Sequence, residues 1–520
     1  MERGSMPEPA TGTAEQQVRW AKLIDHDRCI GCHACTTACK SENEVPLSVN
    51  RTYVKYVDVG VFPQSRRAFQ VTRCNQCERA PCVTACPTGA MFRRADGIVD
   101  FDKSICIGCK ACIAACPYDA IFINPEDHSA EKCNFCAHRL DVGLEPACVV
   151  VCPVEAILIG DLNDPDSKVA QTVSRHPVSV RRPEKETRPR LFYKGAHEAT
   201  LDPIAATRPA GGAFMWSEQQ AGPGFVVSGH PGEHGGPGNS SAAALLAYDV
   251  GHKAPWDWRV SLYTLTKGIA AGAYLAAALL LLTGVLGDRG PLWSWAAPAV
   301  ASAFLGITGG LLLWDLEHPA RFYMIFTRPQ WKSWLVRGAF IIAGYGAVLA
   351  LHLWAALAGW SWLPRPLLGL GLPLGALTAV YTAYLFAQAE GRDLWQNPLL
   401  APHLLVQALL AGSAALIPVA AALERSALPG LLWLLSGSSF VHLLMVAGET
   451  TVTHGTAHAR LALRELTTGR YGAYFWTGAL LVGIAVAAPW IGPAAGASAL
   501  VGLLAFEHAY VQAGQAVPLA

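Results

Sequence analysis

The chain has 520 residues, of which 52% are hydrophobic and 15% are charged, and its formal net charge at pH 7 is +1. This composition is too apolar for a protein that is soluble throughout its length, and the balanced charge gives no reason to expect a nucleic-acid partner. The apolar residues concentrate after about residue 258, whereas charged runs such as residues 181–186 belong to the first half. We therefore expect a polar N-terminal half followed by a half that lies in a lipid bilayer.

Sixteen cysteines lie between Cys29 and Cys152, in four groups of four. The first group has the C-x2-C-x2-C-x3-C spacing of a bacterial iron-sulfur ferredoxin, and the third group repeats it before Pro117. The second and fourth groups keep the outer C-x2-C and C-x3-C-P but lengthen the middle. The groups are Cys29, Cys32, Cys35 and Cys39; Cys74, Cys77, Cys82 and Cys86; Cys106, Cys109, Cys112 and Cys116; and Cys133, Cys136, Cys148 and Cys152.

This spacing predicts iron-sulfur clusters for a physical reason. Three thiolates on a short turning loop can each reach one iron corner of a cube, while the fourth ligand comes from elsewhere in the chain. Disulfides would not need such regular triplets, and zinc sites lack both the triplet and the trailing proline. We therefore predict four [4Fe-4S] clusters, which the N-terminal half needs in order to fold.

The order of the groups over about residues 20–200 resembles the four-cluster electron-transfer subunits of molybdopterin oxidoreductases, such as those of dimethyl sulfoxide reductase, polysulfide reductase and the NrfC-like proteins. The resemblance implies an α+β fold of two ferredoxin-like modules. It also implies that the first group pairs with the fourth and the second with the third, each lending its last cysteine to its partner. The implied ligand sets are Cys29, Cys32, Cys35 and Cys152; Cys133, Cys136, Cys148 and Cys39; Cys74, Cys77, Cys82 and Cys116; and Cys106, Cys109, Cys112 and Cys86.

Proline and glycine crowd together between the two halves, which predicts an irregular tether over residues 195–257. Its low charge and its apolar islands at residues 213–216 and 225–227 suggest that the tether packs along a surface. The expected organisation is a flexible N-terminus at 1–20, an iron-sulfur domain at 21–194, this tether, and a transmembrane domain at 258–520.

The second half predicts an all-α integral membrane bundle of about eight helices, because it contains eight apolar stretches of spanning length. The last two stretches are separated only by Gly492-Pro493. Small residues at 306–310 and 411–414 are expected where helices touch, since close backbone approach stabilises helix pairs in lipid. The stretches are 261–286, 293–314, 335–359, 366–388, 401–423, 429–449, 473–491 and 494–512.

A second resemblance lies between the second and third stretches. Residues 313–322 read Leu-Trp-Asp-Leu-Glu-His-Pro-Ala-Arg-Phe, and Ser333-Trp334 follows. This segment resembles the signature of the NrfD-like membrane subunits, in which an Asp-Leu-x-x-Pro-x-Arg-Phe loop precedes a Ser-Trp at the start of the next helix. Those subunits are the quinone-reactive anchors of polysulfide reductase and its relatives, so the resemblance implies that the membrane half exchanges electrons with the membrane quinone pool.

Quinone chemistry couples two electrons to two protons, so ionisable groups at or within the spans are candidates for the site. For Asp315 and Arg321 the alternative is an ion pair that only shapes the loop, and for Lys267 and Glu390 it is snorkelling to the interface. For His352 and His442 the alternative is hydrogen-bonded packing. The quinone or proton candidates are Asp315, His318, Arg321, His442 and Glu449, with Lys267, His352, Glu390 and His403 as further ionisable groups.

Haem is not expected as a cofactor. The chain has no C-x-x-C-H, which excludes attached c-type haem. Neither His352 nor His442 has a convincing histidine partner in the sequence to serve as the second axial ligand of a membrane haem.

The distribution of lysine and arginine favours one orientation in the cell (inner) membrane. With eight spans both ends of the bundle lie on the side of the clusters, and eleven of the basic residues from 251 onward fall on that side, against Arg289, Arg365 and Arg425 on the other. The positive-inside rule then favours a cytoplasmic iron-sulfur domain, and residues 1–24 contain neither a twin-arginine pair nor an apolar signal core. A periplasmic domain stays open, because a catalytic partner can carry the export signal for a whole complex.

The sequence thus predicts an electron-transfer and membrane-anchor subunit of a respiratory oxidoreductase. Electrons would pass between membrane quinone and a separate catalytic subunit, which the first resemblance implies to be a molybdopterin protein. No G-x-G-x-x-G follows a strand and no nucleophile constellation is present, so a site for the terminal substrate is not expected in this chain. Two alternatives stay open: a component of an energy-conserving quinone complex like alternative complex III, and a membrane redox sensor or assembly protein without quinone turnover.

Overall fold

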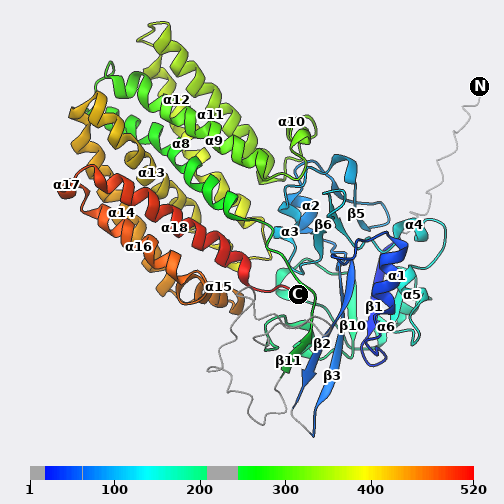
Figure 1. The fold of residues 1–520 in the computed structure, drawn as a ribbon. Helices are drawn as coiled ribbons and strands as arrows, with labels where there is room; N and C mark the ends of the chain where they lie inside the picture. The colour runs from blue at the N-terminus through cyan, green and yellow to red at the C-terminus, as the bar shows by residue number, and fades with distance from the viewer. Residues whose placement is uncertain (1–17, 61–62, 208–243) are drawn as a thin grey trace, which may run out of the picture.

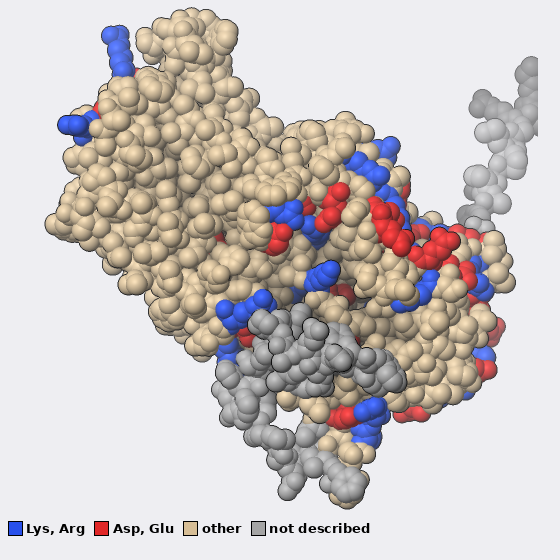
Figure 2. Space-filling view, viewed as in Figure 1, with Lys and Arg blue, Asp and Glu red and all other residues tan. Residues whose placement is uncertain are grey.

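The computed structural model describes residues 18–60, 63–207 and 244–520, which form an α+β domain followed by a helical bundle (Figure 1). This arrangement confirms the predicted fold class. The domain meets one end of the bundle, and the C-terminus lies at this junction (Figure 1). Charged side chains gather over the domain and the junction, whereas the visible face of the bundle is nearly free of them (Figure 2). A surface so poor in charge suits contact with lipid.

The α+β domain contains one four-stranded sheet, one three-stranded sheet and two short hairpins among the described residues. The four-stranded sheet has the order β8-β1-β10-β9, and the three-stranded sheet has the order β11-β2-β3. Because β1 pairs in parallel with β10, the first and last parts of the domain are joined in one sheet. The strands are β1 (Trp20–Asp25), β2 (Thr52–Val59), β3 (Arg66–Arg73), β4 (Met91–Arg93), β5 (Val99–Phe101), β6 (Ile121–Ile123), β7 (Ala130–Lys132), β8 (Ile157–Asp161), β9 (Val178–Ser179), β10 (Leu191–Lys194) and β11 (Ala244–Tyr248).

Short helices follow the cysteine loops and pack in pairs. Helix α1 packs against α5, and α2 packs against α3, so the first cysteine group meets the fourth and the second meets the third. The helices of the domain are α1 (Ala34–Glu42), α2 (Pro81–Ala85), α3 (Ala111–Ala115), α4 (Ala137–Leu140), α5 (Ala147–Val150), α6 (Lys168–Arg175) and α7 (Glu198–Leu201).

The first and third cysteine loops have the same backbone conformation. Gly31 and Gly108 both have φ of 69°, and His33 and Lys110 both have φ of 61°. Two left-handed residues so close together turn the chain sharply, which lets three nearby thiols point to the same side. A side chain at Gly108 would also overlap Glu317 of the membrane half, so this loop needs glycine for packing as well as for conformation.

Part of the predicted tether is a strand. Residues 244–248 form β11, which pairs antiparallel with β2, and its Leu246 is buried beside Val57. The strand is too short for its alternating pattern to stand out from an irregular segment in the sequence. The apolar islands at 213–216 and 225–227 lie outside the described residues.

Seven helices of the described chain are long and apolar enough to cross a bilayer, and α16 is a shorter apolar helix. This agrees with the prediction of about eight helices. The last two predicted stretches separate at a turn, where α16 is followed by α17 (Ala488–Ile491). The bundle helices are α8 (Trp258–Leu282), α9 (Ala297–Trp314), α11 (Trp334–Leu357), α12 (Pro364–Ala387), α13 (Leu400–Leu423), α14 (Leu428–Thr451), α16 (Gly472–Val486) and α18 (Ala494–Ala516).

Helix α8 lies at the centre of the bundle, since 83% of an 18-residue apolar stretch of this helix is buried, more than in any other spanning helix of the described chain. It crosses α13 where Gly272 and Gly412 meet, and a methyl group on either would overlap the backbone of the other helix. The expected contact at 411–414 is therefore confirmed. At 306–310 the contact is made by Thr308, which is fully buried and whose Oγ1 lies 2.9 Å from Thr266 Oγ1 of α8, whereas Gly306, Gly309 and Gly310 have no neighbour within 4 Å on the side where a Cβ would point.

One helix was not expected from the sequence. Helix α15 (Ala457–Thr467) lies between α14 and α16, near the junction, and packs against α18 (Figure 1). Its buried residues include Ala459, Ala462 and Leu466, on one face of an otherwise polar helix. A search for apolar stretches of spanning length passes over such an amphipathic segment.

Candidate electron-transfer and quinone site

All sixteen cysteines are free thiols, and most of them are buried. Cys32 is the exposed one, and Cys29, Cys109 and Cys152 are partly buried. So many buried thiols without a disulfide suit metal ligation.

The first and fourth cysteine groups interleave. The Asn43 side-chain nitrogen lies 3.7 Å from the Sγ atoms of both Cys39 and Cys136. Burial and the nearby thiolates of Cys133, Cys148 and Cys136 raise the pKa of Cys39. In the same way, burial and the neighbouring thiolates of Cys152 and Cys32 raise the pKa of Cys29. The last cysteine of each group therefore lies among the thiols of the other.

The second and third groups interleave in the same manner. A single cavity is lined by Cys86, Cys106, Cys109 and Cys112. Cys74 is a charged neighbour of Cys116. Among the described residues, no three histidine, cysteine or acidic side chains converge closely enough to hold a single metal ion. Thiols spaced around a cavity fit a cube-shaped cluster with iron at its corners, which supplies one-electron transfer when it is bound.

Two buried cations face Cys148. Lys22 Nζ lies 3.4 Å and Arg73 Nη1 lies 3.1 Å from its Sγ, and both side chains are almost fully buried. Although burial opposes ionisation, these charges lower the pKa of the Cys148 thiol to about 7. Lys22 and Arg73 thus favour the thiolate form that a cluster needs.

The loop between α9 and α11 holds the third cysteine loop against the bundle. Arg321 Nη1 donates to the carbonyl oxygens of Lys103 and Cys106, each at 2.9 Å. The His318 backbone N–H donates to the Ile107 carbonyl at 3.2 Å, and its ring Nε2 lies 3.2 Å from Ser129 Oγ. Two of the predicted quinone candidates, His318 and Arg321, therefore form hydrogen bonds with the iron-sulfur domain.

Ser333, the serine of the Ser-Trp pair in the NrfD-like segment, makes a similar contact with the second cysteine group. Its hydroxyl donates to the Ala85 carbonyl at 2.8 Å, next to Cys86. Both cysteine loops that line the shared cavity are thus bonded to the same membrane segment.

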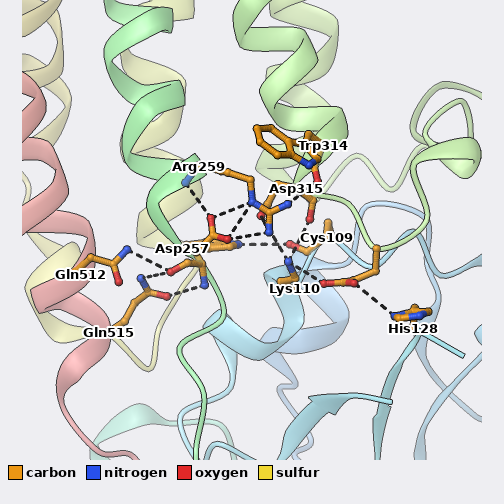
Figure 3. Close-up of polar contacts among 11 residues, drawn as sticks. Cys109, Lys110, His128, Asp257, Arg259, Trp314, Asp315, Gln512 and Gln515 are labelled. Carbon is orange, nitrogen blue, oxygen red and sulfur yellow. Dashed lines mark hydrogen bonds and ion pairs between the residues drawn. The ribbon is translucent and has the colours of Figure 1, made fainter. Parts of the chain in front are cut away.

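Asp315 lies at the centre of a charged network at the junction (Figure 3). Lys110, which follows Cys109, has its Nζ 3.5 Å from Asp315 Oδ1 and 3.0 Å from Glu317 Oε1. Arg259 Nη2 lies 3.7 Å from the same Asp315 oxygen and 2.8 Å from Asp257 Oδ2. Burial raises the pKa of Asp315 to about 6, against the opposing effect of Lys110 and Arg259. Asp315 is thus a partly buried carboxylate paired with Lys110, the residue that follows Cys109.

An aromatic stack continues from the same loop into the bundle. Trp256 Nε1 donates to the Cys109 carbonyl at 3.4 Å, and the Trp256 ring stacks on Trp395 at a centroid distance of 5.5 Å. Phe386 stacks on Trp395 at 4.6 Å. Gln515 of α18 fixes Trp256 by bonding both its backbone N–H and its carbonyl (Figure 3).

The other two candidates form a separate group. His403 Nδ1 lies 3.0 Å from Glu449 Oε1, and His403 Nε2 lies 2.8 Å from His442 Nδ1. Two imidazole nitrogens at that distance are hydrogen-bonded and leave no room for an iron between them. His403 is therefore the histidine partner of His442 that the sequence did not reveal.

The remaining ionisable groups are dispersed. Lys267 does not snorkel, since it is 1% exposed and donates to the Ala379 carbonyl at 2.8 Å and to Thr382 Oγ1 at 2.7 Å. His352 packs between Trp293 and Tyr274, apart from the other histidines, and Glu390 is exposed after α12. Sequence analysis missed Lys110, Arg259 and Glu507. Glu507 lies within the last apolar stretch, where the rule for intramembrane ionisable residues would have found it.

Replacing Arg321 by methionine should loosen the third cysteine loop. The change removes two hydrogen bonds from a charged donor, each contributing about 1.5–3 kcal/mol. We expect iron to leave the protein faster under a chelator, as followed by visible absorbance. Arg337→Met is the matched control, because Arg337 also donates to a backbone carbonyl on this side of the bundle but touches no cysteine loop. Equal rates of iron loss in the two variants would contradict the assigned role.

The fold and the thiols together define an iron-sulfur electron-transfer protein that is integral to a membrane. Comparison with known families agrees with this class. A 4Fe-4S binding domain matches residues 20–41, a 4Fe-4S dicluster domain matches residues 66–162, and the domain described as "Polysulphide reductase, NrfD" matches residues 249–505.

Named relatives match the iron-sulfur part. A tetrathionate reductase subunit of Salmonella typhimurium is 44% identical over 209 residues, 38% of this chain and 80% of that protein. A polysulfide reductase component of Wolinella succinogenes is 42% identical over 177 residues, 34% of this chain and 93% of that protein. The arsenate respiratory reductase iron-sulfur subunit ArrB of a Shewanella species is 36% identical over 224 residues, 34% of this chain and 96% of that protein. The chain belongs to the family of these reductase iron-sulfur subunits, and it carries an NrfD membrane domain in the same polypeptide.

Proposed function

We propose that this protein passes electrons between membrane quinone and a separate catalytic subunit through four [4Fe-4S] clusters. The observation that carries the proposal is a continuous series of thiols from the junction with the bundle to the exposed Cys32. The four ligand sets proposed are Cys106, Cys109, Cys112 and Cys86; Cys74, Cys77, Cys82 and Cys116; Cys133, Cys136, Cys148 and Cys39; and Cys29, Cys32, Cys35 and Cys152.

Neighbouring thiols of different ligand sets support the order of the sets, counted here from the junction in the order just given. Cys82, in the second of these sets, is a charged neighbour of Cys112, in the first. Cys74 of the second set has Cys133 of the third as a neighbour. Cys35 of the fourth set has Cys148 of the third as a neighbour. Each set thus adjoins the next, as a chain of electron carriers requires.

The quinone end of this chain is proposed to lie at the junction, beside Asp315. Oxidation of one quinol releases two electrons and two protons, so the site needs a proton acceptor close to the first electron acceptor. Asp315 fits that need, because it is partly buried and pairs with the residue that follows Cys109. Arg321 and His318 hold the nearby cysteine loop in place.

The opposite end of the chain is proposed to meet the catalytic partner. Two features support this: Cys32 is exposed, and the relatives are named as parts of reductases. That the partner is a molybdopterin protein rests on the family resemblance. The excess of basic residues near the junction favours the cytoplasmic side for the iron-sulfur domain.

Anaerobic reduction of the purified protein by a quinol analogue tests this function. We expect a short-chain naphthoquinol or benzoquinol to bleach the visible absorbance of the clusters, and the cluster signals to be resolved by electron paramagnetic resonance. Protein that dithionite reduces but neither quinol reduces would contradict quinone turnover and leave the redox-sensor or assembly role. Co-purified proteins should contain molybdenum; multihaem cytochromes instead would favour a complex like alternative complex III.

A further inference from the structure

A chain of three ionisable side chains runs into the bundle from its cluster-side end. Glu449 is partly buried at the end of α14, His403 lies in the first turn of α13, and His442 is fully buried in α14. The carboxylate and the two rings are joined by hydrogen bonds of 3.0 Å and 2.8 Å. Among the described residues, none of the three side chains hydrogen-bonds to the iron-sulfur domain.

The order of donors and acceptors in this chain permits proton transfer. When Glu449 is ionised it accepts from His403 Nδ1–H, so His403 Nε2 is left as the acceptor for His442 Nδ1–H. The remaining nitrogen, His442 Nε2, is buried without a hydrogen-bond partner among the described residues. When His442 Nε2 takes up a proton, His442 can pass its Nδ1 proton to His403, and His403 can pass its Nδ1 proton to Glu449.

A small cavity lies between His403 and a second buried carboxylate. His403, Gln407, Thr264 and Glu507 line a cavity with a volume of about 20 Å³. A cavity needs at least ~10–15 Å³ and two to four polar partners to hold one water molecule. Gln407 Oε1 lacks a partner, which leaves it free to bond such a water, and Thr264 Oγ1 donates to Glu507 Oε2 at 2.6 Å. The cavity suits water and is too small for a quinone ring.

The second buried carboxylate, Glu507, lies in the same part of the bundle as a buried cation, Lys267. Glu507 is 5% exposed and Lys267 is 1% exposed, and Glu507 is the charged group that acts on Lys267. Thr382 accepts from Lys267 at 2.7 Å and also lies 3.4 Å from the Tyr263 hydroxyl. Charges inside a membrane are costly, so a buried acid and a buried base within the spans are candidates for a functional role.

All of these groups lie in the half of the bundle nearer the clusters. Lys267 is nine residues from the start of α8, and His442 is nine residues from the end of α14. At 1.5 Å per residue that depth is about 14 Å, roughly half of the ~30 Å hydrocarbon core. The hydrogen-bonded series of Glu449, His403 and His442 therefore runs from the cluster-side end of the bundle to about the middle of the membrane.

A second small cavity lies at the outer end, beside Glu449. Glu449, Asn397, Thr450 and His454 line it, and the His454 ring Nε2 lies 2.9 Å from the Glu449 carbonyl oxygen. Asn397 and His454 lie in cluster-side loops and Glu449 lies in the last turn of α14, so Glu449 is the member of the three nearest the cluster-side end of the bundle.

We propose that Glu449, His403 and His442 form a proton relay that exchanges the protons of quinone chemistry with the side of the membrane that carries the clusters. The inference rests on the proposed quinone function and names the route that serves it. For each quinol oxidised, the two electrons go singly to the clusters and on to an acceptor, and protons leave along the relay to the cluster-side water.

The test is quinol-to-ferricyanide turnover by the full-length protein in vesicles, with the analogue that reduces the wild type as donor and ferricyanide as the one-electron acceptor. For Glu449→Gln and His442→Gln we expect turnover to fall about 10²-fold, in line with the contribution of a positioned acid or base. The KM for quinol and the cluster content should stay unchanged. The solvent deuterium isotope effect on turnover should rise, because proton transfer then limits the rate, and Glu449→Asp should recover part of the activity.

His352→Gln is the matched control, since His352 is an equally buried histidine of the bundle that lies outside the relay. Wild-type turnover in Glu449→Gln and His442→Gln would overturn the relay, as would a loss with an unchanged isotope effect or a loss shared by His352→Gln. A wild-type protein that does not oxidise quinol would overturn the proposed function and the relay together, so the two failures are distinct.

Discussion

Replacing Cys152 by alanine is expected to destroy the cluster held by Cys29, Cys32 and Cys35 while the other clusters remain. The reason is the crossed arrangement: Cys152 is a charged neighbour of Cys29, whereas Cys39 lies among Cys133, Cys136 and Cys148. Loss of one cluster in four should remove about a quarter of the bound iron and free three thiols. Alkylation under native conditions, followed by mass mapping of the peptides, should label Cys29, Cys32 and Cys35.

Cys39→Ala is the matched variant. In the crossed arrangement it should free Cys133, Cys136 and Cys148 instead, and the pattern of labelled peptides should be the reverse of that in Cys152→Ala. If Cys152→Ala exposes the Cys133 group, each cysteine group holds its own cluster and the proposed ligand sets are refuted.

Replacing Asp315 by asparagine is expected to abolish cluster reduction by quinol, with a fall of at least ~10²-fold for the loss of a positioned proton acceptor. Asparagine keeps an oxygen for Lys110 but cannot take up a proton at neutral pH. The cluster content and the reduction by dithionite should be unchanged. Because burial raises the pKa of Asp315 to about 6, wild-type quinol oxidation should decline as the pH falls through about 6 and the carboxylate is protonated. The Asp315→Asn variant should lack that decline.

Glu317→Gln separates proton chemistry from simple pairing. Glu317 is the closer partner of Lys110, at 3.0 Å against 3.5 Å for Asp315, but it is more exposed. If Asp315 only anchors Lys110, the two variants should lose similar activity. Unchanged quinol-dependent reduction in Asp315→Asn would remove Asp315 from the site.

The sequence predicted those parts of the fold that follow from local chemistry. Ligand spacing located the cysteine loops, and the repeated Cys-Ile-Gly-Cys pattern corresponds to loops with equal φ at Gly31 and Gly108. The apolar stretches located the membrane helices within a few residues, because a span must be long and apolar wherever it packs. The strand β11 was not predicted, because it depends on pairing with β2, which a single chain segment does not reveal.

The candidate site was predictable only in part for the same reason. Residues 313–322 and Ser333-Trp334 were recognised as a motif, and the structure places Asp315, Glu317, His318, Arg321 and Ser333 in contact with cysteine loops that lie some two hundred residues earlier. Glu449 and His442 were found as intramembrane ionisable groups, yet their link runs through His403 on another helix. Nothing in the spacing of these residues along the chain records that contact.

By itself, the sequence determined the cofactor chemistry and the membrane setting of this protein. Both depend on residue type and short-range spacing, which a linear chain states directly. The tertiary structure alone decided which thiols become neighbours. It also decided that the NrfD-like loop hydrogen-bonds to the third cysteine loop, and that Glu449, His403 and His442 form one hydrogen-bonded series. Those relations arise from packing between segments far apart in sequence, where the fold sets the distance between two side chains and the sequence does not.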